Sequence, residues 1–245
     1  MIVTAALAWY DEPLQDLDLC LRSLPVVADR LVAVDGGYSR WPDAKASSPA
    51  NQAAFIRSTC KELGLPVKVH VPRKMWAGQV QKRNHLLQLA AKGSDWIVGV
   101  DADHVLHGLR DPVRHEIAAL VDEDAIDVSY YTPMNHDRPL AESASGQWHE
   151  ALAGQYAMIT GLFRALPGLR VERFHWWYSA LKGQIRHWVW GGDTKYPKVL
   201  VHELKAPFFV EHRCLFRDTA HVLANRTFCD DRDKLVRDSG QEDPA

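Results

Sequence analysis

Mostly apolar, strand-like runs alternate with helix-like segments through the first hundred residues, and this alternation constrains the fold more than any other feature. The runs have the length and composition of buried strands, and they lie at residues 2–9, 31–34, 67–71 and 95–100. The helix-like segments between them cover residues 13–24, 51–63 and 79–92. Strands separated by helices indicate βαβ units, which predicts an α/β fold with a mostly parallel central sheet flanked by helices.

Local signals predict where the helices begin and end. Pro13 suits the start of the first helix, whose leucines at positions 14, 17, 21 and 24 share one face. Asn51 is predicted to cap the second helix, because its side chain can accept a hydrogen bond from a free backbone N–H group. Gly64 and Gly93 are predicted to end the second and third helices.

The second half of the chain is less regular. One helix and two strands are predicted, at residues 111–121, 126–131 and 156–163. Residues 132–155 are polar and loop-like, whereas residues 174–190 are dense in tryptophan and histidine. Most of these aromatic side chains are expected to fill a small lobe of the core, with one or two free to stack on a flat ligand.

Length and charge bound the class of protein. With 245 residues, the chain is predicted to form a single domain over 1–245, divided into a ligand-binding half at 1–106, a second half at 107–228 and a polar tail at 229–245. A net charge of −2 gives no global positive field to recruit nucleic acid or anionic membranes. The chain has no apolar stretch of the roughly 18 residues a membrane span needs, no basic leader and no CxxC pair, so a cytoplasmic protein without an integral membrane segment is predicted.

The tripeptide Asp101-Ala102-Asp103 directly follows the strand-like run at 96–100. Open α/β sheets bind ligands at the carboxyl ends of their strands, so both carboxylates are expected in a ligand site. If the strand continues through the tripeptide, the two side chains point the same way and converge on one divalent cation. This placement predicts a metal-dependent enzyme whose substrate carries phosphate, and an acidic turn without a ligand is the alternative.

Other polar groups fall in a fixed order around this tripeptide. Asp11-Glu12-Pro13 follows the first strand, Val34-Asp35-Gly36-Gly37 ends the second, and Lys82-Arg83-Asn84 lies in the third helix. Together with residues 95–103, this order resembles a family 2 glycosyltransferase of the GT-A fold, and the resemblance covers residues 2–106. It implies a Rossmann-like fold with an irregular, aromatic-rich C-terminal acceptor half, and transfer of a sugar from a nucleotide-diphosphate sugar.

The resemblance implies four residues that contact the donor. In this family the nucleotide lies across the ends of the first strands, which assigns the contacts to Glu12, Asp35, Arg83 and Asp101, with a UDP-sugar as the favoured donor. Structural alternatives stand beside three of them. Glu12 would equally complement a helix dipole, Asp35 would be a simple turn residue, and Arg83 would be an exposed helix residue.

The resemblance also implies a Mn²⁺ or Mg²⁺ ion, held by Asp101, Asp103 and the later His212. Imidazole is an acceptable ligand for Mn²⁺, although carboxylates dominate for such hard ions. The ion would neutralise the leaving diphosphate, which Arg213 and Arg217 could also meet. A surface histidine near the end of the strand-like run 208–213 is the alternative for His212.

The acceptor half departs from the family pattern, because the Glu-Asp pair that carries the base and the Gln-x-x-Arg-Trp segment are both absent. An inverting transfer needs a base within reach of the acceptor hydroxyl. Asp193, on a glycine-flanked turn, is the first candidate, followed by Glu172 and His175. An ordinary loop aspartate is the alternative for Asp193. The acceptor is left open between a glycan, a lipid-linked glycan, a protein and a nucleic acid.

The predicted function is therefore metal-dependent glycosyl transfer to an acceptor hydroxyl, with inversion. A haloacid-dehalogenase-like, Mg²⁺-dependent phosphatase is one alternative, although three strand-like runs precede the tripeptide here and none is expected in that class. A nucleotidyltransferase would need a glycine-rich basic loop after the first strand, which residues 9–13 do not provide. A non-catalytic carbohydrate-binding protein is a further alternative, and it would not need the metal carboxylates.

Overall fold

The computed structural model describes residues 1–39, 41, 43–131, 133, 156–166, 168–171, 177–180, 183–186 and 200–213. Its helices are α1 (Leu14–Ser23), α2 (Ala50–Glu62), α3 (Gln79–Ala90) and α4 (Arg110–Ala119), with a short 3₁₀ turn at Leu24–Val26. Its strands are β1 (Val3–Ala8), β2 (Arg30–Val34), β3 (Val67–His70), β4 (Trp96–Asp101), β5 (His104–Gly108), β6 (Ala125–Tyr131), β7 (Tyr156–Arg164), β8 (Arg170–Val171), β9 (Trp177–Ala180), β10 (Gly183–Arg186), β11 (Val201–Glu203) and β12 (Phe208–His212).

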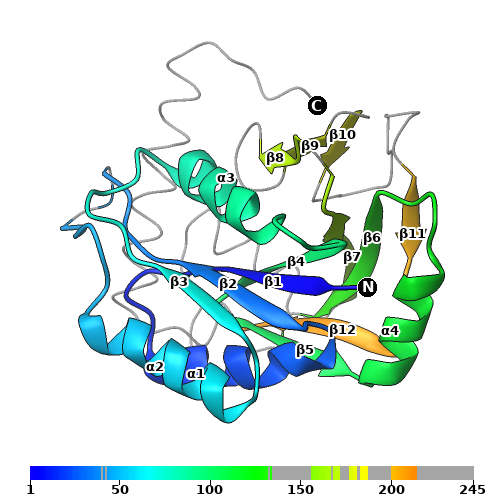
Figure 1. Cartoon of the computed structure of the whole chain (residues 1–245), viewed down its shortest axis with the longest axis horizontal. Coiled ribbons are helices and arrows are strands. Elements are labelled where there is room, and N and C mark those ends of the chain that lie inside the picture. The colour runs from blue at the N-terminus through cyan, green and yellow to red at the C-terminus, as the bar shows by residue number, and fades with distance from the viewer. Residues whose placement is uncertain are drawn as a thin grey trace.

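Most of the strands form one curled, mixed sheet in the order β3-β2-β1-β4-β7-β6-β12-β5, with β11 beside β6 (Figure 1). The first four strands in this order are parallel, so their carboxyl ends lie along one edge. Strand β7 runs antiparallel to β4 and β6, and β12 runs parallel to β6. The predicted α/β class and the Rossmann-like GT-A arrangement are therefore confirmed.

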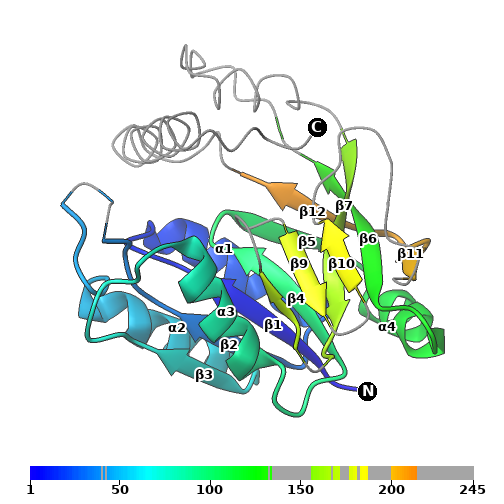
Figure 2. The same cartoon turned by 90° about the horizontal axis from the view of Figure 1, so that it is seen from above.

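Helices cover both faces of the parallel strands. Helices α1 and α2 lie on one face, where Val3, Ala5 and Leu7 of β1 join the larger core. Helix α3 lies on the other face, in front of β1 and β2 in Figure 2, where Ala6 and Ala8 pack with its apolar side chains. Because alternate residues of β1 enter two cores, this strand is buried on both sides, as in parallel sheets generally.

The curl of the sheet brings distant strands to one place. Strand β4 ends at Asp101, residues Ala102 and Asp103 form a turn, and β5 starts at His104. Although β4 and β5 are adjacent in the chain, β4 lies between β1 and β7 whereas β5 pairs with β12. The antiparallel β5–β12 pairing puts His212 directly opposite His104. The end of β12 therefore meets the turn that follows β4.

The sequence-based predictions fail at several local features. Helix α2 begins at Ala50, with Pro49 in the capping position, so the predicted Asn51 cap is wrong. The fixed φ of proline starts the helix two residues earlier than an Asn51 cap would. Strand β5 and the small sheet of β8, β9 and β10 were not predicted, because each is short and pairs by contacts that local patterns do not encode. Among the described residues, no helix is long and apolar enough to cross a bilayer.

Candidate functional site

The first element of the site is an ion pair at the end of β4. Arg83 reaches from α3 and its Nη2 donates to Asp101 Oδ1 at 2.8 Å and Oδ2 at 3.0 Å. The Asp101 side chain keeps about a third of its surface exposed, at 32%, so the pair is open to a ligand on one side. The predicted donor residues Arg83 and Asp101 therefore lie in direct contact at the carboxyl edge of the sheet.

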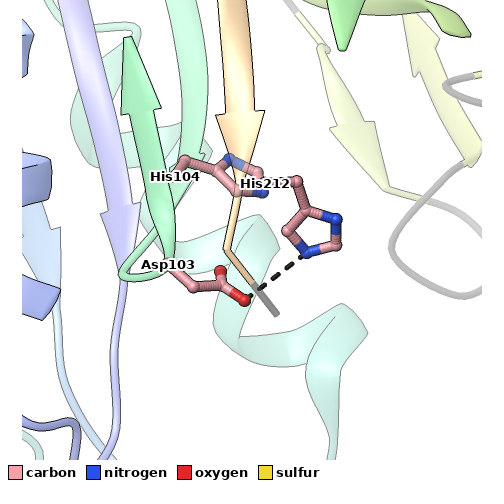
Figure 3. A group of neighbouring side chains, drawn as sticks. All are labelled: Asp103, His104 and His212. Atoms are coloured by element: carbon pink, nitrogen blue, oxygen red, sulfur yellow. Dashed lines mark ion pairs between the residues drawn. The ribbon is translucent and has the colours of Figure 1, made fainter. Parts of the chain in front are cut away.

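The second element joins the turn after β4 to the end of β12. His212 Nε2 lies 3.4 Å from Asp103 Oδ2, and Figure 3 shows the two side chains facing each other beside His104. The backbone N–H of Arg213 also donates to the Asp103 carbonyl at 2.8 Å, which fixes the end of β12 against the turn. Residues predicted separately as metal ligands, far apart in the chain, are thus neighbours.

Asp101 and Asp103 do not share one strand face. Because Ala102 and Asp103 form a turn, the i, i+2 relation of a continuous strand does not hold, and the expectation that both carboxylates point the same way is wrong. Asp101 turns to Arg83 and Asp103 turns to His212. The group of metal-capable side chains in the described residues is Asp103, His104 and His212, without Asp101.

His104 is the member of this group that the sequence reasoning missed. Burial, with a smaller effect of His212, lowers the pKa of His104 to about 4, so its ring is neutral near pH 7. Its Nδ1 accepts the Asp101 backbone N–H at 3.2 Å, which places the proton of the neutral ring on Nε2. A protonated nitrogen is not a ligand, which leaves Asp103 and His212 as the members of this group that could bind a metal, with His104 packed edge-on against His212.

A buried hydrogen-bond network surrounds Asp35, directly after β2. In the sheet, β2 and β4 lie on opposite sides of β1. Asp35 is almost fully buried, and its carboxylate accepts hydrogen bonds from the Gly36 N–H at 2.6 Å, the Ser48 N–H at 2.9 Å and the Ser48 hydroxyl at 2.5 Å. Burial raises the pKa of Asp35, and the hydrogen bonds from Ser48 oppose that rise. Ser48 Oγ also accepts the Asp11 N–H at 2.8 Å, so it joins the loops after β1 and β2.

This network changes how the predicted donor residues can act. The Asp35 carboxylate is enclosed by Gly36 and Ser48, so a direct contact with a nucleotide would require the loop to open. Glu12 is buried too, and its carbonyl accepts a hydrogen bond from the Gln52 side chain at 2.8 Å. Glu12 lies one residue before Pro13, the capping residue of α1, so it is not the first-turn acid of that helix, which is Asp16.

Asn84, next to Arg83, fastens α3 to the small second sheet. Its side-chain amide donates to the Val171 carbonyl at 3.0 Å and its Oδ1 accepts the Val171 N–H at 2.7 Å. These two hydrogen bonds satisfy the Val171 N–H and C=O as a neighbouring strand would. The Arg-Asn sequence therefore has two structural tasks, one directed to Asp101 and one directed to strand β8.

The acceptor side lies largely outside the described residues. Asp193, Glu172 and His175, the three predicted bases, fall there, as do Arg217 and much of the aromatic stretch at 174–190. Arg213 is described, and its guanidinium pairs with Glu211 at 2.9 Å. The catalytic base therefore stays a prediction.

Comparison with known proteins gives distant structural matches alone. No family model and no curated protein matches this chain. S. aureus TarS matches at 19% identity with a TM-score of 0.39, over 58% of this chain and 24% of the TarS chain. TarS 1-349 in complex with UDP-GlcNAc matches at 17% identity with a TM-score of 0.37, over 58% of this chain and 38% of that chain.

A different enzyme is found at the same distance. The 4-diphosphocytidyl-2C-methyl-D-erythritol synthase from Anaerococcus prevotii DSM 20548 matches at 10% identity with a TM-score of 0.38, over 67% of this chain and 70% of that one. The TarS structures include complexes with UDP and with UDP-GlcNAc. Similarity at this level identifies neither a family nor a function, so the geometry of the site has to carry the functional argument.

Proposed function

We propose that this protein is a metal-dependent glycosyltransferase that moves a sugar from a nucleotide-diphosphate sugar, favoured as a UDP-sugar, to an acceptor hydroxyl with inversion. The observation that carries the proposal is the meeting of Asp103 with His212 at the same sheet edge where Arg83 meets Asp101. Asp103 and His212 suit a divalent cation, and Arg83 supplies a fixed positive charge nearby. A diphosphate carries negative oxygens that both positive groups attract, so this sheet edge suits a diphosphate.

The donor set fits a Mn²⁺ or Mg²⁺ ion. Asp103 offers a carboxylate oxygen and His212 a ring nitrogen, and diphosphate oxygens and water would complete the shell, as in many sites where such ions arrive with phosphate. A histidine ligand favours Mn²⁺ over Mg²⁺. Bound there, the ion would offset the charge that develops on the leaving diphosphate.

The protein's own residues would orient the donor around that position. Arg83 presents a guanidinium fixed by Asp101, so it is held in place before a phosphate or ribose oxygen arrives. Asp35 and Ser48 hold the loop that follows β2, where the base would lie. Removal of the acceptor proton is assigned to Asp193, with Glu172 and His175 as alternatives. The acceptor can be a glycan, a lipid-linked glycan, a protein or a nucleic acid.

The phosphatase alternative is less well supported. A haloacid-dehalogenase-like enzyme would use Asp101 as its nucleophile, but Arg83 Nη2 donates to both oxygens of that carboxylate. The nucleotidyltransferase alternative lacks a glycine-rich loop after β1, where the chain reads Trp-Tyr-Asp-Glu-Pro. A binding protein without activity would give nucleotide or sugar binding with no turnover.

A donor screen tests the proposal first. Thermal shifts are measured with UDP, GDP, ADP and CDP, each with Mn²⁺ and after chelation. A ligand at a hundredfold excess over its dissociation constant stabilises the folded state by about 2.7 kcal/mol. The preferred nucleotide is then supplied as its diphosphate sugar, and turnover is followed by release of the nucleoside diphosphate. Stabilisation by none of the four nucleotides in Mn²⁺ contradicts the proposal.

Variants of Asp103 test the assigned metal ligand. Asp103→Ala is expected to abolish turnover and the Mn²⁺-dependent part of nucleotide binding while the protein stays folded. Asp122→Ala, at an exposed bend, is the matched control and should behave as the wild type. Normal turnover of Asp103→Ala in saturating Mn²⁺ would remove Asp103 from the metal site.

The base assignment needs variants of its own. Asp193→Asn should keep donor binding and lower the transfer rate by about a hundredfold or more. Glu172→Gln and His175→Asn are measured beside it, because the family's own base residues are absent. A near-normal rate in Asp193→Asn with a collapse in one of the others would move the role to that residue.

A further inference from the structure

Lys82 is a buried cation that the proposed reaction does not use. It lies in the first turn of α3, between Gln81 and Arg83, and its side chain is 2% exposed. Its ammonium donates to the Trp9 carbonyl at 2.7 Å and to the Gly36 carbonyl at 2.9 Å. The sequence contained it in the Lys-Arg-Asn run but gave no sign that it points inward.

The two carbonyls belong to different loops at the carboxyl edge. Trp9 is the first residue after β1, and Gly36 lies two residues after the end of β2. Lys82 therefore links the two chain segments as they leave the sheet. Trp76 also holds the loop after β2. Its backbone N–H donates to the Gly37 carbonyl at 3.0 Å, and its indole Nε1–H donates to the Asp35 carbonyl at 2.7 Å.

Burying the Lys82 ammonium costs desolvation free energy. The pKa of Lys82 is lowered to about 7, mainly by burial and also by Arg83 on the same helix, while Asp35, Glu12 and Asp101, which follow or end β2, β1 and β4, act to raise it. The Tyr38 ring faces the ammonium at 5.5 Å. An apolar side chain of similar length would avoid the desolvation penalty, so the lysine adds a geometric constraint and not bulk stability.

We propose that Lys82 is a positioning residue for the donor, which fixes the Trp9 and Gly36 backbones so that the loops after β1 and β2 are formed before the nucleotide arrives. This inference rests on the proposed function. Loops that are already ordered remove part of the entropy penalty of binding, and a binding-competent state that is populated only in part weakens the apparent affinity in proportion. Lys82 acts through the backbone and needs no contact with the donor.

The test uses Lys82→Met, which keeps the length of the side chain and removes its charge and donors. UDP binding in Mn²⁺ is measured by calorimetry, and KM and kcat are measured with the UDP-sugar. Loops formed about a tenth of the time predict about a tenfold weaker UDP affinity and a similar rise in KM. Because Lys82 does not touch the reacting atoms, kcat should change by less than about threefold. Leu86→Met, a buried neutral change on the same helix, is the control.

A pH series supplies a readout that simple loss of packing would not change. If the charged form of Lys82 closes the loops, UDP affinity of the wild type should fall between pH 7 and 9, as the ammonium loses its proton. Lys82→Met should lack this fall. UDP ionises equally in both experiments, so the difference belongs to the protein. If Lys82→Met does not fold, Lys82→Gln loses the charge, keeps an N–H donor and carries the same comparison.

The outcomes separate the two proposals. Wild-type protein that binds no UDP in Mn²⁺ or Mg²⁺ overturns the UDP-dependent function, and the positioning role with it. Wild-type protein that binds UDP, beside a Lys82 variant with the same affinity, KM and pH profile, overturns the positioning role alone.

Discussion

The two sides of the site are built in opposite ways. On the side of β1 and β2, Lys82, Asp35 and Ser48 form what we call the loop support, which is buried and whose hydrogen bonds run to the protein itself. On the side of β4 and β12, Asp101 and His212 keep 32% and 25% of their side chains exposed. Under the proposed function, the buried residues would shape the site and the more exposed side would meet the ligand. Changes that remove packing or hydrogen bonds around Asp35 and Ser48 should reduce stability, changes to Lys82 should reduce donor affinity, and changes at the exposed side should reduce activity.

Gly36→Ala should break the loop support most severely. Gly36 has φ +112°, and an added Cβ would lie 2.6 Å from Pro72 Cγ and 2.7 Å from the Ala46 carbonyl oxygen. Overpacking and backbone strain each destabilise by about 1–3 kcal/mol, so we expect a loss of about 2–4 kcal/mol in urea unfolding. Gly78→Ala is the control, because its Cβ would have nothing within 4 Å. Equal stability of the two variants would show that the loop can rearrange.

Ser48→Ala should have a smaller effect of the same kind. It removes a hydroxyl that donates to Asp35 and accepts from the Asp11 N–H, while the backbone bond to Asp35 remains. Loss of a hydrogen bond to a charged group predicts about 1.5–3 kcal/mol of destabilisation. Ser58→Ala removes an exposed hydroxyl that bonds only within α2, and it should change stability by less than about 0.5 kcal/mol. A Ser48 variant as stable as the Ser58 variant would refute the coupling of the two loops.

The pH dependence of stability sharpens the comparison further. The pKa of Lys82 is about 7 in the folded protein and 10.5 ordinarily, so between these values the unfolded chain binds the extra proton. Stability rises with pH wherever the unfolded state binds more protons, so this residue contributes an increase from about pH 7 upward. Lys82→Met should lack that contribution. The wild-type minus variant difference in unfolding free energy, measured at pH 7 and 9, should increase, and a decrease would refute the burial of a titrating ammonium.

His212→Asn should have the smallest effect on stability and a large effect on binding. The contact with Asp103 is exposed on the His212 side alone, and asparagine can still donate a hydrogen bond to that carboxylate, so we expect a loss of about 1 kcal/mol. Loss of a metal ligand should nevertheless weaken UDP binding in Mn²⁺ by at least about tenfold. A His212 variant that is strongly destabilised but binds UDP normally would place this residue with the loop support.

The sequence predicted the regular part of this architecture well. Residues 2–101 repeat strand and helix with strong local signals, and the helices and strands predicted there are present. The pairing of strands far apart in the chain could not be predicted from local sequence signals. Strand β5 follows β4 directly but pairs with β12, and this pairing brings His104 and His212 together. The local pattern nominated Asp103 and the family resemblance nominated His212, but neither could show that the turn at Ala102 separates Asp101 from them.

Buried polar residues were the other limit of the sequence reasoning. Lys82 reads as an exposed helix cation, and Ser48 as one of several polar residues in a loop. Only the fold shows that Lys82 lies under two loops and that Ser48 encloses Asp35. Asp35 illustrates the consequence, because its position was correctly predicted at the sheet edge while its carboxylate points into the protein.

The measurement that tests the central claim most directly is the coupling between Mn²⁺ and UDP. Calorimetric titrations of UDP are run with Mn²⁺ and after chelation, for the wild type and for Asp103→Asn, a change that removes the charge at nearly constant size. Coupling between two ligands of one site is reciprocal, so Mn²⁺ should tighten UDP binding to the wild type by about tenfold or more and UDP should tighten Mn²⁺ binding equally. Asp103→Asn should show no coupling. Equal UDP affinity of the wild type with Mn²⁺ and after chelation would contradict a metal-dependent nucleotide site at this edge.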